Sequence, residues 1–114
     1  MINTEIRKAL LDPRIGVPPY QFQAPEHAPS EHIVYTYVSD RGEMYSEGEE
    51  DIQWSEAQLD IHHPTNYTTL LKTVKTVLKE YGFYIGDGWG RYDNALGISY
   101  YTLRILKEIE DASN

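Results

Sequence analysis

The hydrophobic pattern of the chain is clearest between residues 65 and 81, where apolar side chains recur at spacings of three and four. This period places them on one face of an α-helix. The apolar positions are Tyr67, Leu70, Leu71, Val74, Val77, Leu78 and Tyr81. Thr65 or Asn66 can cap the start of the helix, and Gly82 is suited to end it. One apolar face needs one covering surface, so we expect a sheet to pack against this helix.

A second, shorter helix is predicted near the start of the chain, at residues 3–11. Its apolar stripe consists of Ile2, Ile6, Ala9 and Leu10. Pro13 lies where the helix should end, because proline cannot continue a helical hydrogen-bond pattern. The connector at residues 13–29 is rich in proline and therefore extended. Within it, Tyr20 and Phe22 alternate with glutamines, which predicts a short edge strand.

Two long strands are predicted between the connector and the main helix. Residues 32–38 are almost all β-branched or aromatic, with apolar side chains at both parities. We expect a central strand there, covered on both faces. Residues 51–63 form the next strand. Its apolar positions change parity after Trp54, which predicts a β-bulge near Ser55 or Glu56.

The C-terminal part of the chain predicts two further strands. Residues 83–85 form a short one, residues 86–90 form a glycine-rich loop, and residues 97–106 form a long one. The polar residues 107–114 are expected to fray. The complete order is α-β-β-β-α-β-β, which predicts a single α+β domain over residues 1–114, with an antiparallel β-sheet packed against two α-helices.

The composition narrows the range of functions. A chain of 114 residues has room for one modest core. It contains no cysteine, so disulfides, thiolate chemistry and Cys-ligated metals are excluded. We find no apolar run long enough to span a membrane, and the N-terminus does not have the form of a signal peptide. These features fit an intracellular protein or part of an assembled particle.

The negative charge of the chain is concentrated in one stretch. The formal net charge is −8, and residues 40–60 contain eight acidic residues against Arg41 alone. Such a field repels nucleic acid and attracts a basic partner. A solvated loop that keeps the protein soluble is the simpler interpretation.

No group of residues has the spacing of a known catalytic, cofactor or metal site, so we expect no enzyme activity and no cofactor. His62 and His63 are adjacent on a predicted strand and therefore face opposite sides, which prevents them from ligating one metal. Asp87, Asp93 and Asn94 lack the spacing of a calcium loop. The glycine-rich loop does not lead into a helix, as a phosphate-binding loop would.

The abundance of large aromatic side chains predicts a protein interface. The chain contains 10 tyrosines and 2 tryptophans, which is more than one small core hides fully. Tyr and Trp often anchor interfaces between proteins. The alternative is a sheet face that the protein's own loops partly shield.

The order of these segments resembles a known protein family. The segments are the helix NTEIRKALL, the run APEHAPSE leading into HIVYTYVSD, an acidic turn, the strand DIQWSEAQLDIHH, the helix NYTTLLKTVKTVLKEYGF and the hairpin YDNALGISYYTLRI. Together they resemble the tail-completion (tail-terminator, head–tail joining) proteins of long-tailed bacteriophages and prophages. The entry into the strand at HIVY and the end of the helix at Gly82-Phe83 carry most of the resemblance.

The resemblance implies a structural role in virion assembly. A subunit of this family forms a homo-oligomeric ring, often a hexamer, that caps the tail tube and contacts the tail-tube and head-connector proteins. It is localised in the virion tail, and in the host cytoplasm during assembly. DNA passes through such a ring without specific binding, and an acidic lining would keep it from sticking. The interface or lumen residues that we expect are Glu47, Glu49, Glu50, Asp51, Trp54 and Trp89.

A second function class also fits the charge. A small acidic inhibitor or DNA mimic would bind a basic protein, and its partner would be a nucleic-acid-binding protein. A mimic needs acidic groups along a long face, whereas this chain has them gathered in one stretch, which favours the assembly protein.

Overall fold

The computed structural model describes residues 2–43, 52–93, 95 and 97–108 of the chain. The elements in chain order are α1 (Ile2–Leu10), β1 (Pro19–Gln21), β2 (His32–Glu43), β3 (Ile52–His63), α2 (Thr68–Glu80), β4 (Tyr84–Asp93) and β5 (Ile98–Glu108). This is the predicted order, and the fold is the predicted α+β class. None of the helices in these ranges is long and apolar enough to cross a membrane.

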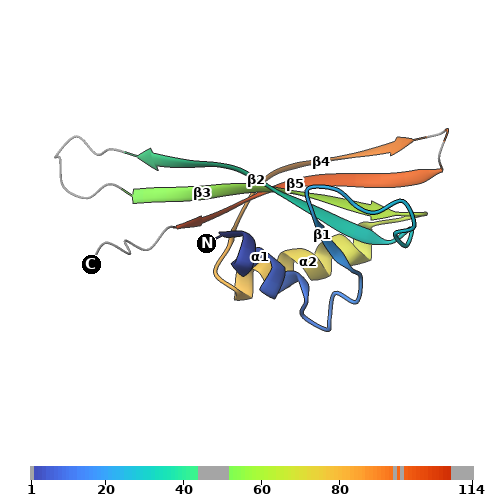
Figure 1. Ribbon diagram of the computed structural model, residues 1–114, viewed down its shortest axis with the longest axis horizontal. Coiled ribbons are helices and arrows are strands. Elements are labelled where there is room, and N and C mark those ends of the chain that lie inside the picture. The colour runs from blue at the N-terminus through green and yellow to red at the C-terminus, as the bar shows by residue number, and fades with distance from the viewer. Residues whose placement is uncertain (1, 44–51, 94, 96, 109–114) are drawn as a thin grey trace.

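The five strands form one elongated sheet in the order β1-β2-β3-β5-β4. β1 pairs with β2 in parallel, and the remaining neighbours pair antiparallel. β2 and β3 form one long hairpin and β4 and β5 form another, and the two hairpins extend in opposite directions (Figure 1). The sheet therefore has β4 at one edge and β2, partly covered by β1, at the other.

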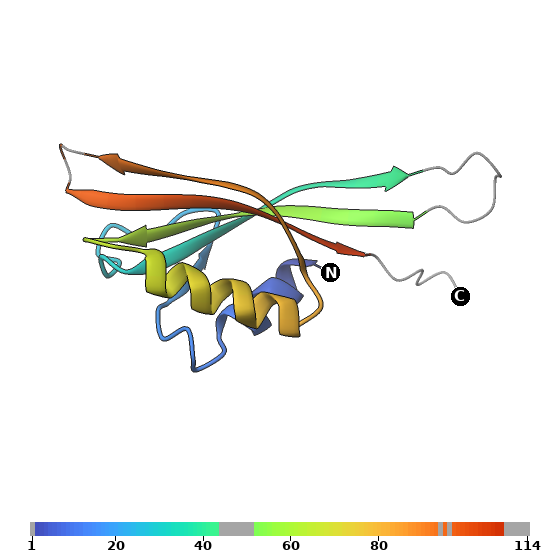
Figure 2. The ribbon, with the colours of Figure 1, turned by 180° about the vertical axis from the view of Figure 1, so that it is seen from behind.

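Both helices pack on the same face of the sheet (Figures 1 and 2). The core lies between this face and the helices, and the stripe predicted for α1 is buried in it as expected. Its fully buried members include Ile6, Leu10, Ile33, Tyr35, Leu59, Ile61, Val74, Val77, Leu78, Leu103 and Ile105. Burying this many apolar side chains is the main force that holds the helices on the sheet.

The start of α2 is held by side chains that precede the helix. Nδ1 of His63 accepts hydrogen bonds from the backbone N–H groups of Thr65 and Asn66, at 3.1 and 3.0 Å. Oδ1 of Asn66 accepts one from the N–H of Thr68 at 2.8 Å. The predicted capping role therefore falls to Asn66, although the residue at the N-cap position is Tyr67, which makes no side-chain cap bond.

The end of α2 depends on a glycine, as predicted. Gly82 has a φ of 90°, a conformation that side-chain-bearing residues rarely adopt. This turn lets the N–H of Phe83 donate to the carbonyl oxygen of Leu78 at 2.9 Å. The chain then leaves the helix and enters β4.

Lys107 connects the end of β5 with α1 and with the C-terminal end of α2. Its Nζ lies 3.0 Å from a carboxylate oxygen of Glu5 in α1 and donates to the carbonyl oxygen of Tyr81 at 3.0 Å. It also lies 4.9 Å from the centre of the Phe83 ring. The prediction that the tail frays from residue 107 is therefore wrong for Lys107 and Glu108, which belong to β5. The remaining residues of that tail lie outside the described part of the chain.

A network of charged groups joins the turn after α1 to the end of α2. The guanidinium of Arg14 contacts both carboxylate oxygens of Asp12 and both of Glu80, at 2.8–3.2 Å. Hydrogen bonds from Arg14 lower the pKa of Asp12 to about 2 and also lower the pKa of Glu80. Both carboxylates stay ionised well below neutral pH, so this contact is lost only in strong acid.

The predicted β-bulge lies on a different strand. The register of the β2–β3 pair shifts between Tyr37 and Ser39, so the extra residue belongs to β2. β3 itself pairs with β5 without a shift from Trp54 to His63. The change of parity along β3 has another cause: Trp54 lies on the face opposite to the core and packs beside Tyr84 instead of turning inward.

The predicted glycine-rich loop is part of a strand. β4 runs through residues 86–90 and has a register shift between Ile85 and Gly88. Gly88 and Gly90 are needed because side chains lie against them: a Cβ on Gly88 would come 2.6 Å from the ring of Tyr101, and one on Gly90 would overlap the hydroxyl of Tyr67. These glycines therefore mark close packing and not a loop.

The prediction that β2 is covered on both faces is confirmed only in part. Ile33 and Tyr35 point into the core, where the helices cover them. On the other face, the described part of the chain places no helix (Figure 2). Val34 is nevertheless buried there, whereas Val38, further along the strand, is 41% exposed.

Candidate interaction surface

The sheet face opposite to the helices, called here the open face, is the most distinctive surface of the protein. Its residues alternate with the buried ones along each strand. The strand registers align one residue from β2, β3, β5 and β4 in a single row, namely His32, His62, Tyr100 and Arg91. Tyr20 of β1 extends this row to the remaining strand. One line of ring and guanidinium groups thus crosses the whole sheet.

The members of this row contact one another from strand to strand. The rings of His32 and His62 are stacked, with centroids 4.3 Å apart and an angle of 13° between planes. The ring of Tyr100 meets His62 edge-on at 4.7 Å, and the guanidinium of Arg91 lies 5.5 Å from the centre of Tyr100. Such cross-strand contacts fix the register of a sheet.

A polar network lies beside the row on the same face. The hydroxyl of Thr102 donates to Asp60 at 2.7 Å, and the amide of Gln58 reaches the other oxygen of Asp60 at 3.5 Å. Arg104 forms an ion pair with Glu56, whose side chain is 6% exposed. Glu56 and Asp60, two carboxylates of the open face, are therefore engaged with neighbouring side chains of the sheet.

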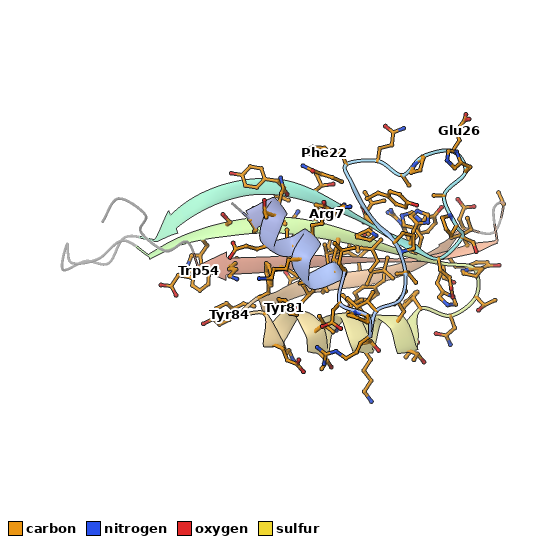
Figure 3. All side chains as sticks on the ribbon, turned by 60° about the horizontal axis from the view of Figure 1, so that its bottom comes forward. Arg7, Phe22, Glu26, Trp54, Tyr81 and Tyr84 are labelled. Atoms are coloured by element: carbon orange, nitrogen blue, oxygen red, sulfur yellow. The ribbon has the colours of Figure 1, made fainter. Side chains whose placement is uncertain are left out.

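The two tryptophans predicted to lie at an interface are both on the open face but are not together. Trp54 packs edge-on against Tyr84 at 5.1 Å, on the half of the sheet where the β2–β3 hairpin extends (Figure 3). Trp89 pairs in register with Thr102 on β5 and is 47% exposed. The other predicted residues, namely Glu47, Glu49, Glu50 and Asp51, lie outside the described residues.

Large apolar side chains remain exposed on two strands in particular. The described residues with this property are Leu11, Phe22, Tyr37, Val38, Tyr84, Trp89 and Tyr92. Five of these seven belong to β2 and β4. The prediction of a protein interface stays a prediction, and these exposed side chains are where it would be tested first.

The adjacent histidines lie on opposite faces of β3, as predicted. His62 belongs to the open-face row, whereas Nε2 of His63 lies 2.7 Å from a carboxylate oxygen of Glu31. Among residues 2–43, 52–93, 95 and 97–108, no three His, Cys, Asp or Glu side chains form a group that could hold a metal ion. A shallow hollow of about 410 Å³ lies beside Arg91, Tyr92 and Tyr100 near the β4–β5 turn.

His62 has a perturbed pKa because of its place in the row. Burial lowers the pKa of His62 from its ordinary value of 6.5, and the neighbouring His32 and Arg91 lower it further, against the opposing effect of Asp60. Below pH 6.5, His62 therefore binds a proton more readily in the unfolded chain than in the folded chain. The free energy of unfolding must then fall as the pH drops below 6.5.

This effect can be measured by urea unfolding between pH 7.5 and pH 5. We expect the stability to fall with decreasing pH, with a slope of at most about 1.4 kcal/mol for each pH unit. Replacement His62→Phe keeps an aromatic ring and removes the titration, so its slope should be flatter. Asp12 and Glu80 have lowered pKa values in both proteins, so their contribution cancels when the two slopes are compared. Equal slopes for both proteins would contradict the assignment to His62.

Comparison with known proteins is informative at the level of structure. No protein-family model and no curated protein sequence matches the chain. A solved structure does match, from the "Virion of native gene transfer agent (GTA) particle", with a TM-score of 0.60. The chain is similar in fold to a virion component. The match covers 96% of this chain and 91% of that chain at 10% sequence identity, so the likeness shows a shared fold along nearly the whole length.

Sequence reasoning missed the row of aromatic and basic groups. Its members are spread over five strands, and only the pairing of the strands brings them together. One pair of the row could have been predicted from the sequence. A turn after Tyr92 makes Arg91 and Tyr100 partners on neighbouring strands. The pairing of His32 with His62 also follows once the two strands are joined as a hairpin.

Proposed function

We propose that the chain is a structural subunit of a virion that completes the tail. In this role it caps the end of the tail tube and joins it to the head connector, without catalysis. The observation that carries the proposal is the match in fold, over nearly the whole of both chains, with a component of a virion particle. The order of sequence segments, which resembles that of tail-completion proteins, supports the finer assignment to the tail.

A subunit of this kind acts as a homo-oligomeric ring, for which we expect six copies, in contact with tail-tube and head-connector proteins. The acidic residues Glu47, Glu49, Glu50 and Asp51 then acquire a role, although they lie outside the described residues. Placed toward the lumen, they would repel DNA, so the genome would pass without binding.

The alternative of an acidic inhibitor or DNA mimic has less support. A mimic presents free acidic groups along a surface. On the open face, Glu56 is paired with Arg104 and Asp60 accepts hydrogen bonds from Thr102 and Gln58. These two carboxylates bind side chains of neighbouring strands and are not arranged to face a basic partner.

The proposal is tested by deleting the coding sequence from the genome that carries it and imaging the lysate by electron microscopy. We expect filled heads and separate tails, with few joined particles, because no subunit caps the tube. Expression of the chain from a plasmid should restore joined particles. Normal particles in the deletion strain would contradict the proposal.

A third strain in the same experiment tests the acidic residues. It expresses the variant Glu47→Gln, Glu49→Gln, Glu50→Gln and Asp51→Asn, which keeps side-chain size and removes four charges. We expect joined particles to fall at least tenfold, or infectivity to fall by that factor among joined particles. A matched variant with two surface charges removed elsewhere, Glu26→Gln and Asp87→Asn, serves as control. Full joining and infectivity in the quadruple variant would exclude a role for these charges.

A further inference from the structure

His63 joins three segments of the chain at the end of β3. One of its ring nitrogens, Nδ1, accepts hydrogen bonds from the N–H groups of Thr65 and Asn66, at 3.1 and 3.0 Å. The other ring nitrogen, Nε2, lies 2.7 Å from a carboxylate oxygen of Glu31, which directly precedes β2. A single imidazole therefore holds both the segment that leads into β2 and the segment that leads into α2.

These contacts fix the protonation state of the ring. A backbone N–H group can only donate a hydrogen bond, so the Nδ1 atom that faces two of them carries a lone pair and no proton. Nε2 faces a carboxylate, which only accepts when it is ionised, so Nε2 carries the proton. In this neutral tautomer of His63, every contact of the ring joins a donor to an acceptor.

A second proton on the ring is incompatible with this arrangement. Histidine changes its charge between pH 8 and pH 5 more readily than other side chains, and Nδ1 is the ring position left for the proton. The new donor would point at the N–H groups of Thr65 and Asn66. The hydroxyl of Thr65 lies 3.5 Å from Nδ1 and can accept from it. Protonation of His63 thus exchanges two bonds to the backbone for one bond to a hydroxyl.

The titratable groups around His63 do not replace the lost bonds. Among the described residues, Glu31 is the charged group that forms an ion pair with the ring, and it favours the protonated form. His62 and the groups around it belong to the open face, on the other side of β3. The row of His63 continues with Ser99 on β5 and Tyr92 on β4. The first turn of α2 contains no acidic residue.

The segment held by Nδ1 sets the start of α2. Oδ1 of Asn66 accepts a hydrogen bond from the N–H of Thr68 at 2.8 Å. The carbonyl oxygen of Thr65 accepts one from the hydroxyl of Ser99 at 2.7 Å. The next residue is Tyr67, whose ring packs against the sheet. Loss of the bonds to Nδ1 therefore loosens the first turn of α2, while the bond from Ser99 keeps the segment near β5.

We propose that His63 is a pH-sensitive switch for the start of α2. With Nδ1 unprotonated, the ring binds residues 65 and 66, and the first turn of the helix is closed on the end of β3. With Nδ1 protonated, the two N–H groups are released and this turn opens. The opening stays local, because Val74, Val77 and Leu78, the buried residues of α2, lie beyond its first turn. The switch does not depend on the proposed role in a virion.

NMR spectroscopy of the ¹⁵N-labelled protein between pH 7.5 and pH 5.0 tests the switch. The ring signals of His63 report which nitrogen carries a proton, and the amide signals of Thr65 and Asn66 report exchange with solvent. At pH 7.5 we expect the proton on Nε2. As Nδ1 gains a proton, exchange of both amides, corrected for the intrinsic effect of pH, should become at least about tenfold faster with the same midpoint. The N–H of Phe83, bonded at the other end of α2, should not change.

Three variants separate the ring from other causes. His63→Asn places an amide oxygen near the position of Nδ1 and cannot gain a proton, so slow exchange should persist at pH 5.0. His63→Leu removes the acceptor, so exchange should be fast at both pH values. His62→Phe removes the adjacent histidine on the opposite face and should keep the full response. Circular dichroism checks that each variant is folded, and the wild-type measurement decides by itself where one is not.

The proposal is overturned if Nδ1 of His63 carries the proton at pH 7.5, or if it gains one while both amides keep their slow exchange. It is also overturned if neither the ring nor the amides respond down to pH 5.0. Opening in His63→Asn that equals the opening in the wild-type protein would place the cause in another group and contradict the switch.

Discussion

Replacing Leu78 by alanine is expected to lower the free energy of unfolding by about 3 kcal/mol. Leu78 lies on α2, is 0% exposed, and belongs to the core between the helix and the sheet. Its neighbours are held by the sheet on one side and by α1 on the other, so they cannot collapse fully into the space that the shorter side chain leaves. The loss is a large share of the stability of a small domain.

Urea unfolding at pH 7.5 and a fixed protein concentration measures this loss. The control is Lys79→Ala on the exposed side of the same helix, which should change the stability by less than about 0.5 kcal/mol. Leu71→Ala, at a partly buried position, should fall between the two. A loss below about 1 kcal/mol for Leu78→Ala would mean that α2 does not cover the sheet as described.

Replacing Gly88 by alanine is expected to destabilise the protein by about 1–2 kcal/mol. In an open strand this change would stabilise by about 0.5–1 kcal/mol, because glycine loses more conformational freedom on folding. Here the added Cβ would come within 2.6 Å of the ring of Tyr101, and overpacking of this kind costs about 1–3 kcal/mol. The steric cost outweighs the entropic gain, since Tyr101 also packs against Tyr67 and Lys75.

The steric origin of this loss is tested by a second substitution. In a Tyr101→Leu background the end of the ring is absent, so Gly88→Ala should then cost less than about 0.5 kcal/mol. The matched control Asp87→Ala, at the exposed neighbouring position, should be near neutral in both backgrounds. The same loss for Gly88→Ala in both backgrounds would contradict the contact with Tyr101.

The elements that the sequence predicts well are those with a strong local pattern. The stripe of α2 and the four apolar residues of α1 repeat at helical spacing, and both helices bury the faces expected of them. The end of α2 at Gly82 follows from local backbone chemistry. The edge strand β1 was also predictable, because Tyr20 alternates with polar neighbours beside prolines.

The elements that the sequence predicts poorly depend on contacts between distant residues. Glycines usually mark loops, but Gly88 and Gly90 are in a strand because the rings of Tyr101 and Tyr67 occupy the space above them. The parity change at Trp54 looks like a bulge, but it reflects a contact with Tyr84 on another strand. In both cases, side chains far apart in the sequence decide the local structure.

The candidate surface was predictable only in part. Trp54 and Trp89 were chosen as aromatic residues suited to an interface, and both lie on the open face, partly or largely exposed. The edge position of β4 could not be foreseen, because it follows from the strand order of the sheet. A pattern of single residues carries no information on which strand lies outermost.

The location of the chain in purified particles tests the central claim most directly. Antibodies against the chain, bound to particles and imaged by electron microscopy with gold labels, show where the subunits lie. The account predicts labels at the junction of head and tail, including particles whose heads have been detached to expose the end of the tube. Labels confined to another part of the particle, or a chain that stays in the soluble lysate and is absent from purified particles, would contradict it.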